Sequence, residues 1–304
     1  MAASHHPEWA LAAVVLANDR YLITPAGWAV EIRNRILNVR IQVMLRTMLG
    51  LAATGMSAQI ATGIHLHDVR FKGDTQLEGV DFKKCASDLK SKLYVGADWS
   101  DYFVGTVRTK CLLDKGYFKS AVTASTQQLP DKNDTHQFAV TFDIQAGPRY
   151  RLGRITFKGN HAISDPEALR DLFPLKDGSI LDRMAIAKGL ENLRDAYGEL
   201  GYINFTAVPS TTFDDKKKLG FLDLDVDEGK QFYVSSIGIL GVDPQALNDL
   251  SLTRGQVYNV RLVNEFIRKH LRGVDVNDWK VQQRVLDERN GTVALTFDFR
   301  SPTE

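Results

Sequence analysis

The chain has 304 residues, of which 44% are apolar and 25% are charged, and its formal net charge is +1. This composition is that of a globular protein with room for about two or three domains. The balanced charge gives no basic surface of the kind that nucleic-acid-binding proteins carry, so we expect no nucleic-acid partner.

Residues 1–63 differ from the rest and are predicted to be a disordered extension followed by a signal peptide. Several arginines up to Arg46 precede a short apolar run and small residues that end at Ala58. A basic segment, an apolar run and small residues in this order are typical of secretory signals. Met44 would be a better start for such a signal, so we interpret residues 1–43 as misassigned or disordered. The alternative is a cytosolic protein with a disordered head.

Residues 64–148 have the pattern of a β-α-α-β-β unit. Alternation of apolar and polar residues predicts strands, and apolar spacings of three and four predict helices. The expected elements are Ile64–Gly73, helices at about 79–92 and 99–114, and the strands Tyr117–Gln127 and Gln137–Ile144.

The two cysteines of the chain fall on the two helices predicted in this unit. Cys85 shares one helical face with Phe82 and Leu89, and Cys111 shares one with Val107. Paired helices bring both thiols inward. Two interpretations stay open, which are a disulfide between Cys85 and Cys111 and two buried free thiols.

Residues 149–232 give the clearest unit. A strand-like run ends at Gly159-Asn160, and Ser164 or Asp165 is placed to cap a first helix. Asp182 is placed to cap a second helix. The apolar stripe of that helix consists of Ile186, Leu190, Leu193, Tyr197 and Leu200. The charged residues Arg183, Lys188, Glu191 and Arg194 are expected to face water.

Gly201 is expected to stop this second helix, because glycine readily takes the positive φ of a helix end. The strands Tyr202–Phe213 and Leu219–Asp227 follow. Pro209 cannot donate a hydrogen bond to a neighbouring strand, so the first of the two should lie at a sheet edge.

Residues 233–304 form a shorter third unit. Asp243-Pro244 predicts a helix start, and Asn290-Gly291 predicts a tight hairpin turn before the last strand. Glycine landmarks set the period, with 86 positions from Gly73 to Gly159 and 82 from Gly159 to Gly241. Such regularity indicates an internal repeat.

Five motifs follow one another in the second unit. They are Phe157-Lys158-Gly159-Asn160, Leu175-Lys176-Asp177-Gly178, Leu193-Arg194-Asp195-Ala196-Tyr197, Gly201-Tyr202 and Val226-Asp227-Glu228-Gly229. In this order they resemble a POTRA (polypeptide-transport-associated) domain of the outer-membrane assembly factor family. The resemblance covers about residues 64–300 and is looser in the outer units. It implies an α+β fold of tandem β-α-α-β-β modules, each a three-stranded sheet covered by two antiparallel helices.

This resemblance implies a periplasmic, non-enzymatic protein that takes part in outer-membrane protein assembly or translocation. Expected partners are unfolded outer-membrane protein clients or a separate β-barrel protein, with no cofactor, metal or small-molecule substrate. Family members usually carry such modules ahead of a membrane barrel. This chain ends at Glu304, which favours an accessory or scaffold role.

The expected mechanism is β-augmentation, in which a client strand pairs with an open sheet edge. Two alternatives are a structural adaptor that docks on an envelope complex without touching clients, and a periplasmic enzyme, which would need a deep pocket with convergent polar groups. No catalytic set of serine, histidine and carboxylate is evident. The candidate edge residues are Tyr117, Lys119, Ala121, Tyr202, Asn204 and Thr206.

Overall fold

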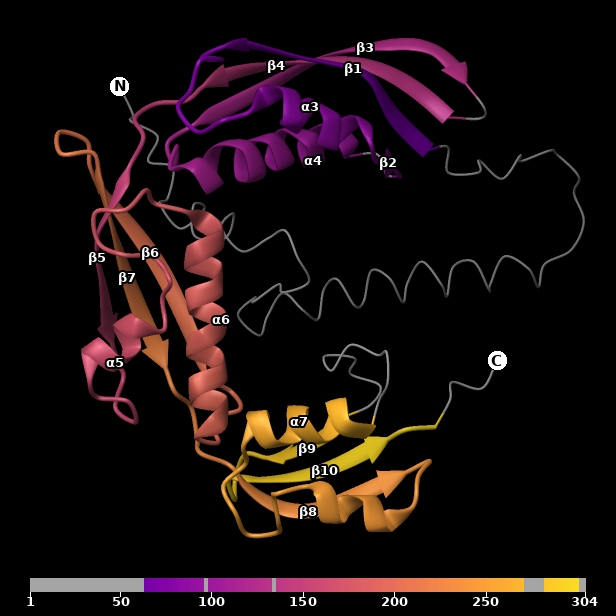
Figure 1. Ribbon diagram of the computed structural model, residues 1–304, viewed down its shortest axis with the longest axis vertical. Coiled ribbons are helices and arrows are strands. Elements are labelled where there is room, and N and C mark those ends of the chain that lie inside the picture. The colour runs from indigo at the N-terminus through magenta and orange to yellow at the C-terminus, as the bar shows by residue number, and fades with distance from the viewer. Residues whose placement is uncertain (1–62, 96–97, 133–134, 271–281, 301–304) are drawn as a thin grey trace, which may run out of the picture. The chain divides into compact units, whose positions relative to one another are not determined.

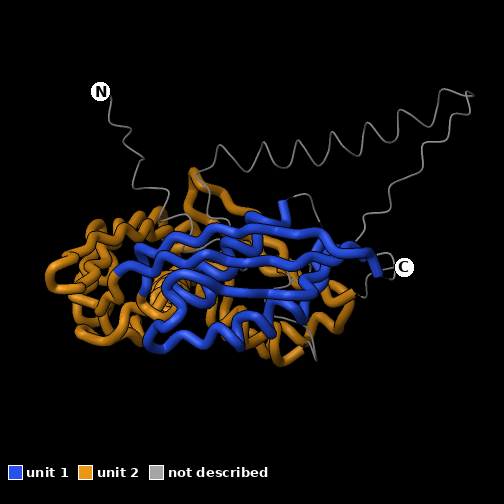
Figure 2. The backbone as a smooth tube through the Cα atoms, turned by 90° about the horizontal axis from the view of Figure 1, so that it is seen from above, with its two compact units in different colours: residues 1–113, 117–147 blue, residues 114–116, 148–304 orange. Residues whose placement is uncertain are grey.

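The computed structural model describes residues 63–95, 98–132, 135–270 and 282–300. The expected signal peptide lies outside these residues. The chain divides into two compact units (Figure 2). The first consists of Met1–Leu113 and Tyr117–Gly147, and the second of Asp114–Gly116 and Pro148–Glu304. The first compact unit contains most of the first predicted repeat, and the second contains the other two repeats. Each compact unit is described by itself.

The first unit is a sheet with helices on one face (Figure 1). The sheet has four strands in the order β2-β1-β4-β3, where three were predicted. The extra strand arises because the short segment Leu93–Tyr94 pairs with Ile64 and His65. The elements are β1 (Gly63–Gly73), α3 (Phe82–Lys90), β2 (Leu93–Tyr94), α4 (Trp99–Thr106), β3 (Ala121–Lys132) and β4 (Thr135–Gln145).

The second helix of this unit does not stay α-helical to residue 114 as expected. After Thr106 it continues as a π-helix, η1 (Val107–Leu112), and a 3-10 turn, η2 (Leu113–Lys115). The buried Thr106 and Thr109 hydroxyls donate to backbone carbonyls four residues earlier, each at 2.8 Å. Such bonds compete with the helical ladder and loosen it. The wider turns keep Val107 and Leu112 in the core.

The second unit begins with a three-stranded sheet in the order β5-β7-β6. Asp165 caps α5 through the Glu167 N–H at 3.0 Å, and Asp182 caps α6 through the Met184 N–H at 2.7 Å, as predicted. The elements are β5 (Arg151–Lys158), α5 (Pro166–Asp171), α6 (Arg183–Glu199), β6 (Thr206–Asp214) and β7 (Leu219–Asp227).

Two predictions for side chains of α6 are wrong. Leu200 is 39% exposed because it is the C-cap residue, where the helix has already ended. Arg183 was expected to face water, but its side chain is buried because it forms an ion pair with Asp114 at 2.8 Å. The other members of the stripe are buried.

The second unit also holds a third sheet, in the order β8-β10-β9. Its first helix is a 3-10 helix, η3 (Pro244–Asp249), which begins after Asp243 as predicted. The remaining elements are β8 (Tyr233–Leu240), α7 (Val260–His270), β9 (Gln282–Asp287) and β10 (Thr292–Asp298). The α+β fold class of tandem helix-covered sheets is therefore confirmed. Within the ranges that the structure describes, no helix is long and apolar enough to cross a membrane.

The same glycine turn follows the second helix in the first two repeats. Gly116 has φ +93° and Gly201 has φ +88°, which side chains with a Cβ rarely adopt. The next N–H, of Tyr117 or Tyr202, donates five residues back, at 3.1 and 3.0 Å. This is the closing bond of a Schellman helix end. The glycine carbonyls accept N–H bonds from Tyr150 and Phe232 respectively, at 2.8 and 2.9 Å.

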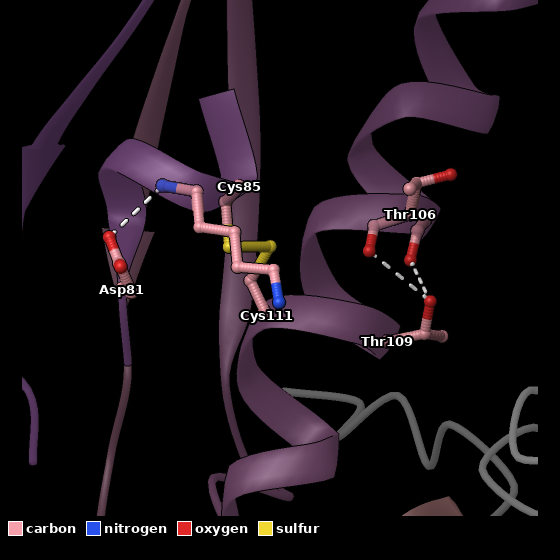
Figure 3. Close-up of a disulfide and its surroundings, with 7 residues drawn as sticks. Asp81, Cys85, Thr106, Thr109 and Cys111 are labelled. Atoms are coloured by element: carbon pink, nitrogen blue, oxygen red, sulfur yellow. Dashed lines mark hydrogen bonds between the residues drawn. A yellow bond between two sulfur atoms is a disulfide. The ribbon is translucent and has the colours of Figure 1, made fainter. Parts of the chain in front are cut away.

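The structure joins Cys85 of α3 to Cys111 of η1 by a disulfide (Figure 3). Their Cα atoms are 6.3 Å apart and 26 positions separate them in the chain. The bond ties two helices that cover the same sheet, and Cys111 belongs to the buried core cluster.

We predict that Cys85→Ser/Cys111→Ser lowers the free energy of unfolding of the first unit by about 3 kcal/mol, because the bond restricts the unfolded chain. Urea unfolding of the full chain measures the change, with the wild-type chain in reductant as control. Equal stability of wild type and variant, with two free thiols in the mass spectrum of the wild type, would contradict the disulfide.

Two helical glycines should respond to alanine with opposite signs. A Cβ on Gly189 of α6 would lie 2.0 Å from the buried Phe173 ring, whereas a Cβ on Gly105 of α4 would meet nothing within 4 Å. We expect Gly189→Ala to destabilise its unit by about 1–3 kcal/mol through overpacking. Gly105→Ala should stabilise its unit by about 0.5–1 kcal/mol, because alanine favours the helix. Thermal unfolding of the two variants measures both changes in stability. A loss of stability in Gly105→Ala would contradict the finding that a Cβ at this position has room.

Candidate polypeptide-binding edges

Each of the three sheets ends on the strand that pairs antiparallel with its central strand. These end strands are β3, β6 and β9. In the described part of the chain, no segment pairs with their outer sides. Each therefore presents backbone donors and acceptors to solvent, which is the template that β-augmentation uses.

The opposite edges are partly covered by the chain itself. In the first unit, β2 pairs with the start of β1. In the second unit, the Gly178 N–H donates to the Leu152 carbonyl of β5 at 2.7 Å. The Gly255 N–H donates to the Val234 carbonyl of β8, also at 2.7 Å. Each repeat thus covers the start of its first strand, which is β1, β5 or β8, and leaves open the strand that follows its helices, which is β3, β6 or β9.

The three open edges differ in how well they are protected. β6 carries Pro209 at its centre, and β9 is six residues long and carries Arg284. Prolines, charges and short length are the usual means by which natural sheets block edge pairing. β3 has neither charge nor proline from Ala121 to Leu129, and Pro130, Asp131 and Lys132 lie only at its end. The exposed side chains from Ala121 to Gln128 are uncharged. β3 is the least protected edge of the three.

The structure corrects the starts of the two predicted edge strands. Tyr117 and Lys119 precede β3, which begins at Ala121. The Ser120 N–H donates to the Tyr117 carbonyl at 3.3 Å, so this segment forms a turn. Tyr117 is buried and its hydroxyl donates to the Glu78 carbonyl at 3.2 Å. Of these candidates only Ala121 lies on the edge strand.

The same correction applies in the second repeat. Tyr202 and Asn204 precede β6, which begins at Thr206. The Phe205 N–H donates to the Tyr202 carbonyl at 3.2 Å, again within a turn. The Asn204 side chain donates to Glu288 instead of facing a client. The glycine turn needs about four residues before an extended strand can start, a distance that strand propensity alone did not reveal.

Two hollows border the described residues. One of about 490 Å³ lies in the first unit, between His65, His67 and Gln137 and the end of β3 at Leu129 and Pro130. His65 Nδ1 lies 3.0 Å from the Gln137 side-chain oxygen. The other, of about 510 Å³, lies in the second unit. Among the described residues, no three histidine, cysteine or acidic side chains are placed to hold a metal ion.

Comparison with known proteins identifies the second repeat. Residues 150–229 match the family model described as POTRA, surface antigen variable number repeat. The match includes β5, α5, α6, β6 and β7, which is one complete β-α-α-β-β repeat.

Two curated relatives are similar over longer stretches. The chain is 23% identical over 239 residues to a Treponema pallidum protein described as an outer membrane protein assembly factor, covering 76% of the chain and 28% of the relative. It is 21% identical over 196 residues to the outer membrane protein assembly factor BamA of Buchnera aphidicola, covering 63% and 31%. The chain thus spans less than a third of the length of either relative.

A solved structure supports the fold. The crystal structure of POTRA domains 3–5 of Haemophilus influenzae BamA matches with a TM-score of 0.58 at 20% identity. The match covers 81% of this chain and all of that one. The tandem sheets described above are therefore arranged in a POTRA-type fold.

The open side of β3 should be visible in the hydrogen exchange of its backbone amides. Along an antiparallel edge strand, successive N–H groups point alternately to the neighbour and to solvent. We expect slow and fast hydrogen exchange to alternate from Val122 to Gln128, whereas the central β4 should be protected throughout. NMR exchange of the full chain reads both strands at once. Continuous protection along β3 would mean that something already covers this edge.

Proposed function

We propose that this chain, a POTRA-domain protein related to outer membrane protein assembly factors, takes part in outer-membrane protein assembly by pairing with extended client polypeptides. The observation that carries the proposal is the edge of β3, which has no charge and no proline from Ala121 to Leu129. An extended segment that adds to this edge would gain main-chain hydrogen bonds from Ala121 to Leu129.

Main-chain pairing suits a protein that handles many clients. Backbone groups are the same in every sequence, so the edge does not require one particular client motif. The outward side chains of β3, among them Thr123, Ser125 and Gln127, are uncharged and exposed. They neither repel a client strand nor demand a complementary charge.

The disulfide supports a periplasmic site of action. Such bonds persist in oxidising compartments and are rare in the cytosol. Cys85 and Cys111 are bonded in the first unit, the same unit that carries β3. A location on the periplasmic side of the outer membrane places this edge where outer-membrane precursors pass.

The remaining edges are proposed to contribute less. On β6, Pro209 removes one N–H from the strand, and β9 is short. A client would therefore bind the first unit in preference to the second. This ordering distinguishes the proposal from a generic role for every module.

The test is an NMR titration of the full chain with peptides taken from the strands of an outer-membrane barrel. We expect the largest shift changes at amides from Val122 to Gln128. The adaptor alternative predicts no peptide binding and a single stoichiometric partner in a pull-down. Peptide-induced changes confined to regions away from β3 would overturn the proposal.

Proline substitutions sharpen this test. Thr126 and Gln127 are adjacent, exposed and on the open edge, so one of their N–H groups points to solvent. Of Thr126→Pro and Gln127→Pro, the variant that keeps wild-type unfolding should bind peptide roughly tenfold more weakly, because it loses one donor and blocks its neighbour. The matched control, Pro209→Val on β6, should leave binding at β3 unchanged. Unaltered affinity in the folded proline variant would exclude backbone pairing at this strand.

A further inference from the structure

The hollow of about 490 Å³ in the first unit lies on the face of the sheet that the helices leave uncovered (Figure 1). All of its lining residues come from the four strands of the sheet, and none comes from a helix. On β4, Phe138 packs against the core, whereas the neighbouring Gln137 borders the hollow. Successive residues of a strand point to opposite faces, so the hollow is on the side away from α3 and α4.

One row of residues, with one member from each strand, lines this hollow. His65 of β1 pairs with Leu93 of β2 on one side and with Gln137 of β4 on the other, and Gln137 pairs with Leu129 of β3. His65 Nδ1 lies 3.0 Å from the Gln137 side-chain oxygen, so the two polar members of the row contact each other. The two ends of the row are apolar, and Leu93 is 62% exposed.

Two β-bulges border the same hollow. The pairing of β1 with β4 shifts between Leu66 and Asp68, so His67 is the extra residue there. The pairing of β3 with β4 shifts between Leu129 and Lys132. Bulges bend a strand, increase its twist and are over-represented beside functional sites. Two bulges at one end of one sheet account for the hollowed shape of its face.

The row of residues continues to the open edge of β3. A strand that adds to this edge would place one residue opposite Leu129, with its side chain on the face of the hollow and about 5 Å from that of Leu129. Pro130 has no N–H, and the bulge bends β3 at this point, so regular pairing with an added strand ends at Leu129. The side chain of the last paired client residue therefore meets the hollow.

We propose that this hollow binds an aromatic side chain of the client, an inference that rests on the proposed pairing at β3. A short side chain opposite Leu129 would end beside it, whereas an aromatic ring is long enough to cover Leu129 and reach Gln137. The ring would remove apolar surface of Leu129 and Pro130 from water. None of the residues that line the hollow is acidic, so a neutral ring meets no unpaired carboxylate there.

Such a site would fix the register of a bound client. Backbone groups repeat along β3, and its exposed side chains from Ala121 to Gln128 are uncharged, so main-chain pairing alone lets a client slip along the edge. Strands of outer-membrane barrels carry aromatic residues at both ends of their apolar band, so clients of this class offer the required side chain. The edge supplies binding, and the hollow selects one alignment of the client.

The experiment is an NMR titration of the full chain with two short barrel-strand peptides that differ in one residue. One peptide contains a single phenylalanine, and the other has alanine in its place. We expect the phenylalanine peptide to bind about tenfold more tightly, because its ring leaves water at the hollow. Its ring protons should lie close to the side-chain protons of Leu129 and Gln137, which nuclear Overhauser effects detect.

A pair of variants locates the source of this preference. Leu129→Ala removes apolar surface from the hollow and should reduce the preference for phenylalanine to about twofold or less. The matched control is Gln127→Ala, which changes the same face of the same strand outside the hollow and should keep the full preference. The alanine peptide should bind the wild type and both variants equally, because the backbone of β3 is unchanged.

The outcomes separate this inference from the proposed function. Suppose that the alanine peptide shifts the β3 amides but phenylalanine adds no affinity, or that Leu129→Ala keeps the full preference. The aromatic site is then excluded and the pairing at β3 stands. If neither peptide shifts the β3 amides, both proposals are wrong. Dimerisation in sedimentation that Leu129→Ala abolishes would assign this face to a second copy of the chain and would also overturn the inference.

Discussion

Backbone N–H and C=O groups at a sheet edge need hydrogen-bond partners. Within the residues that the structure describes, the chain supplies such partners along part of one edge of each sheet and leaves the other edge open. The strand that opens each repeat is partly covered by its own chain, through β2 in the first unit and through the segments ending at Gly178 and Gly255 in the second. The strand that follows the helices is left open. This asymmetry recurs in all three sheets, so it belongs to the fold and not to one local sequence. The sheets differ in whether proline, charge or short length protects the open strand against pairing.

The glycine turn decides where that open strand begins. Gly116 and Gly201 take a positive φ, end the second helix of their repeats and direct the chain into a turn. Their carbonyls accept hydrogen bonds from Tyr150 and Phe232, which stand just before the first strands of the following repeats. Glycine at this position thus ends the helix and sets the distance to the next strand. Its carbonyl also accepts a hydrogen bond from the following repeat. A Cβ at Gly201 would approach Val257 to 2.6 Å, so close packing adds to the demand for glycine.

Periodic patterns predicted most of this fold from the sequence. The caps at Asp165 and Asp182 and the order of strands and helices were readable because each depends on a few neighbouring residues. The π-helix after Thr106, the two-residue strand β2 and the burial of Arg183 were not readable, because they depend on distant partners or on threonine hydroxyls that compete with the helix. The edge strands were anticipated, but four of the six candidate residues lie in the turns before them.

The central claim is that β3 pairs with an extended polypeptide through its backbone. Isotope-filtered NMR of the complex between the labelled full chain and an unlabelled barrel-strand peptide tests this claim most directly, because it detects protons of one partner close to protons of the other. The account predicts a regular ladder of contacts between backbone protons of β3, from Val122 to Gln128, and backbone protons of the peptide. Contacts only between side chains, or contacts that avoid β3, would contradict it.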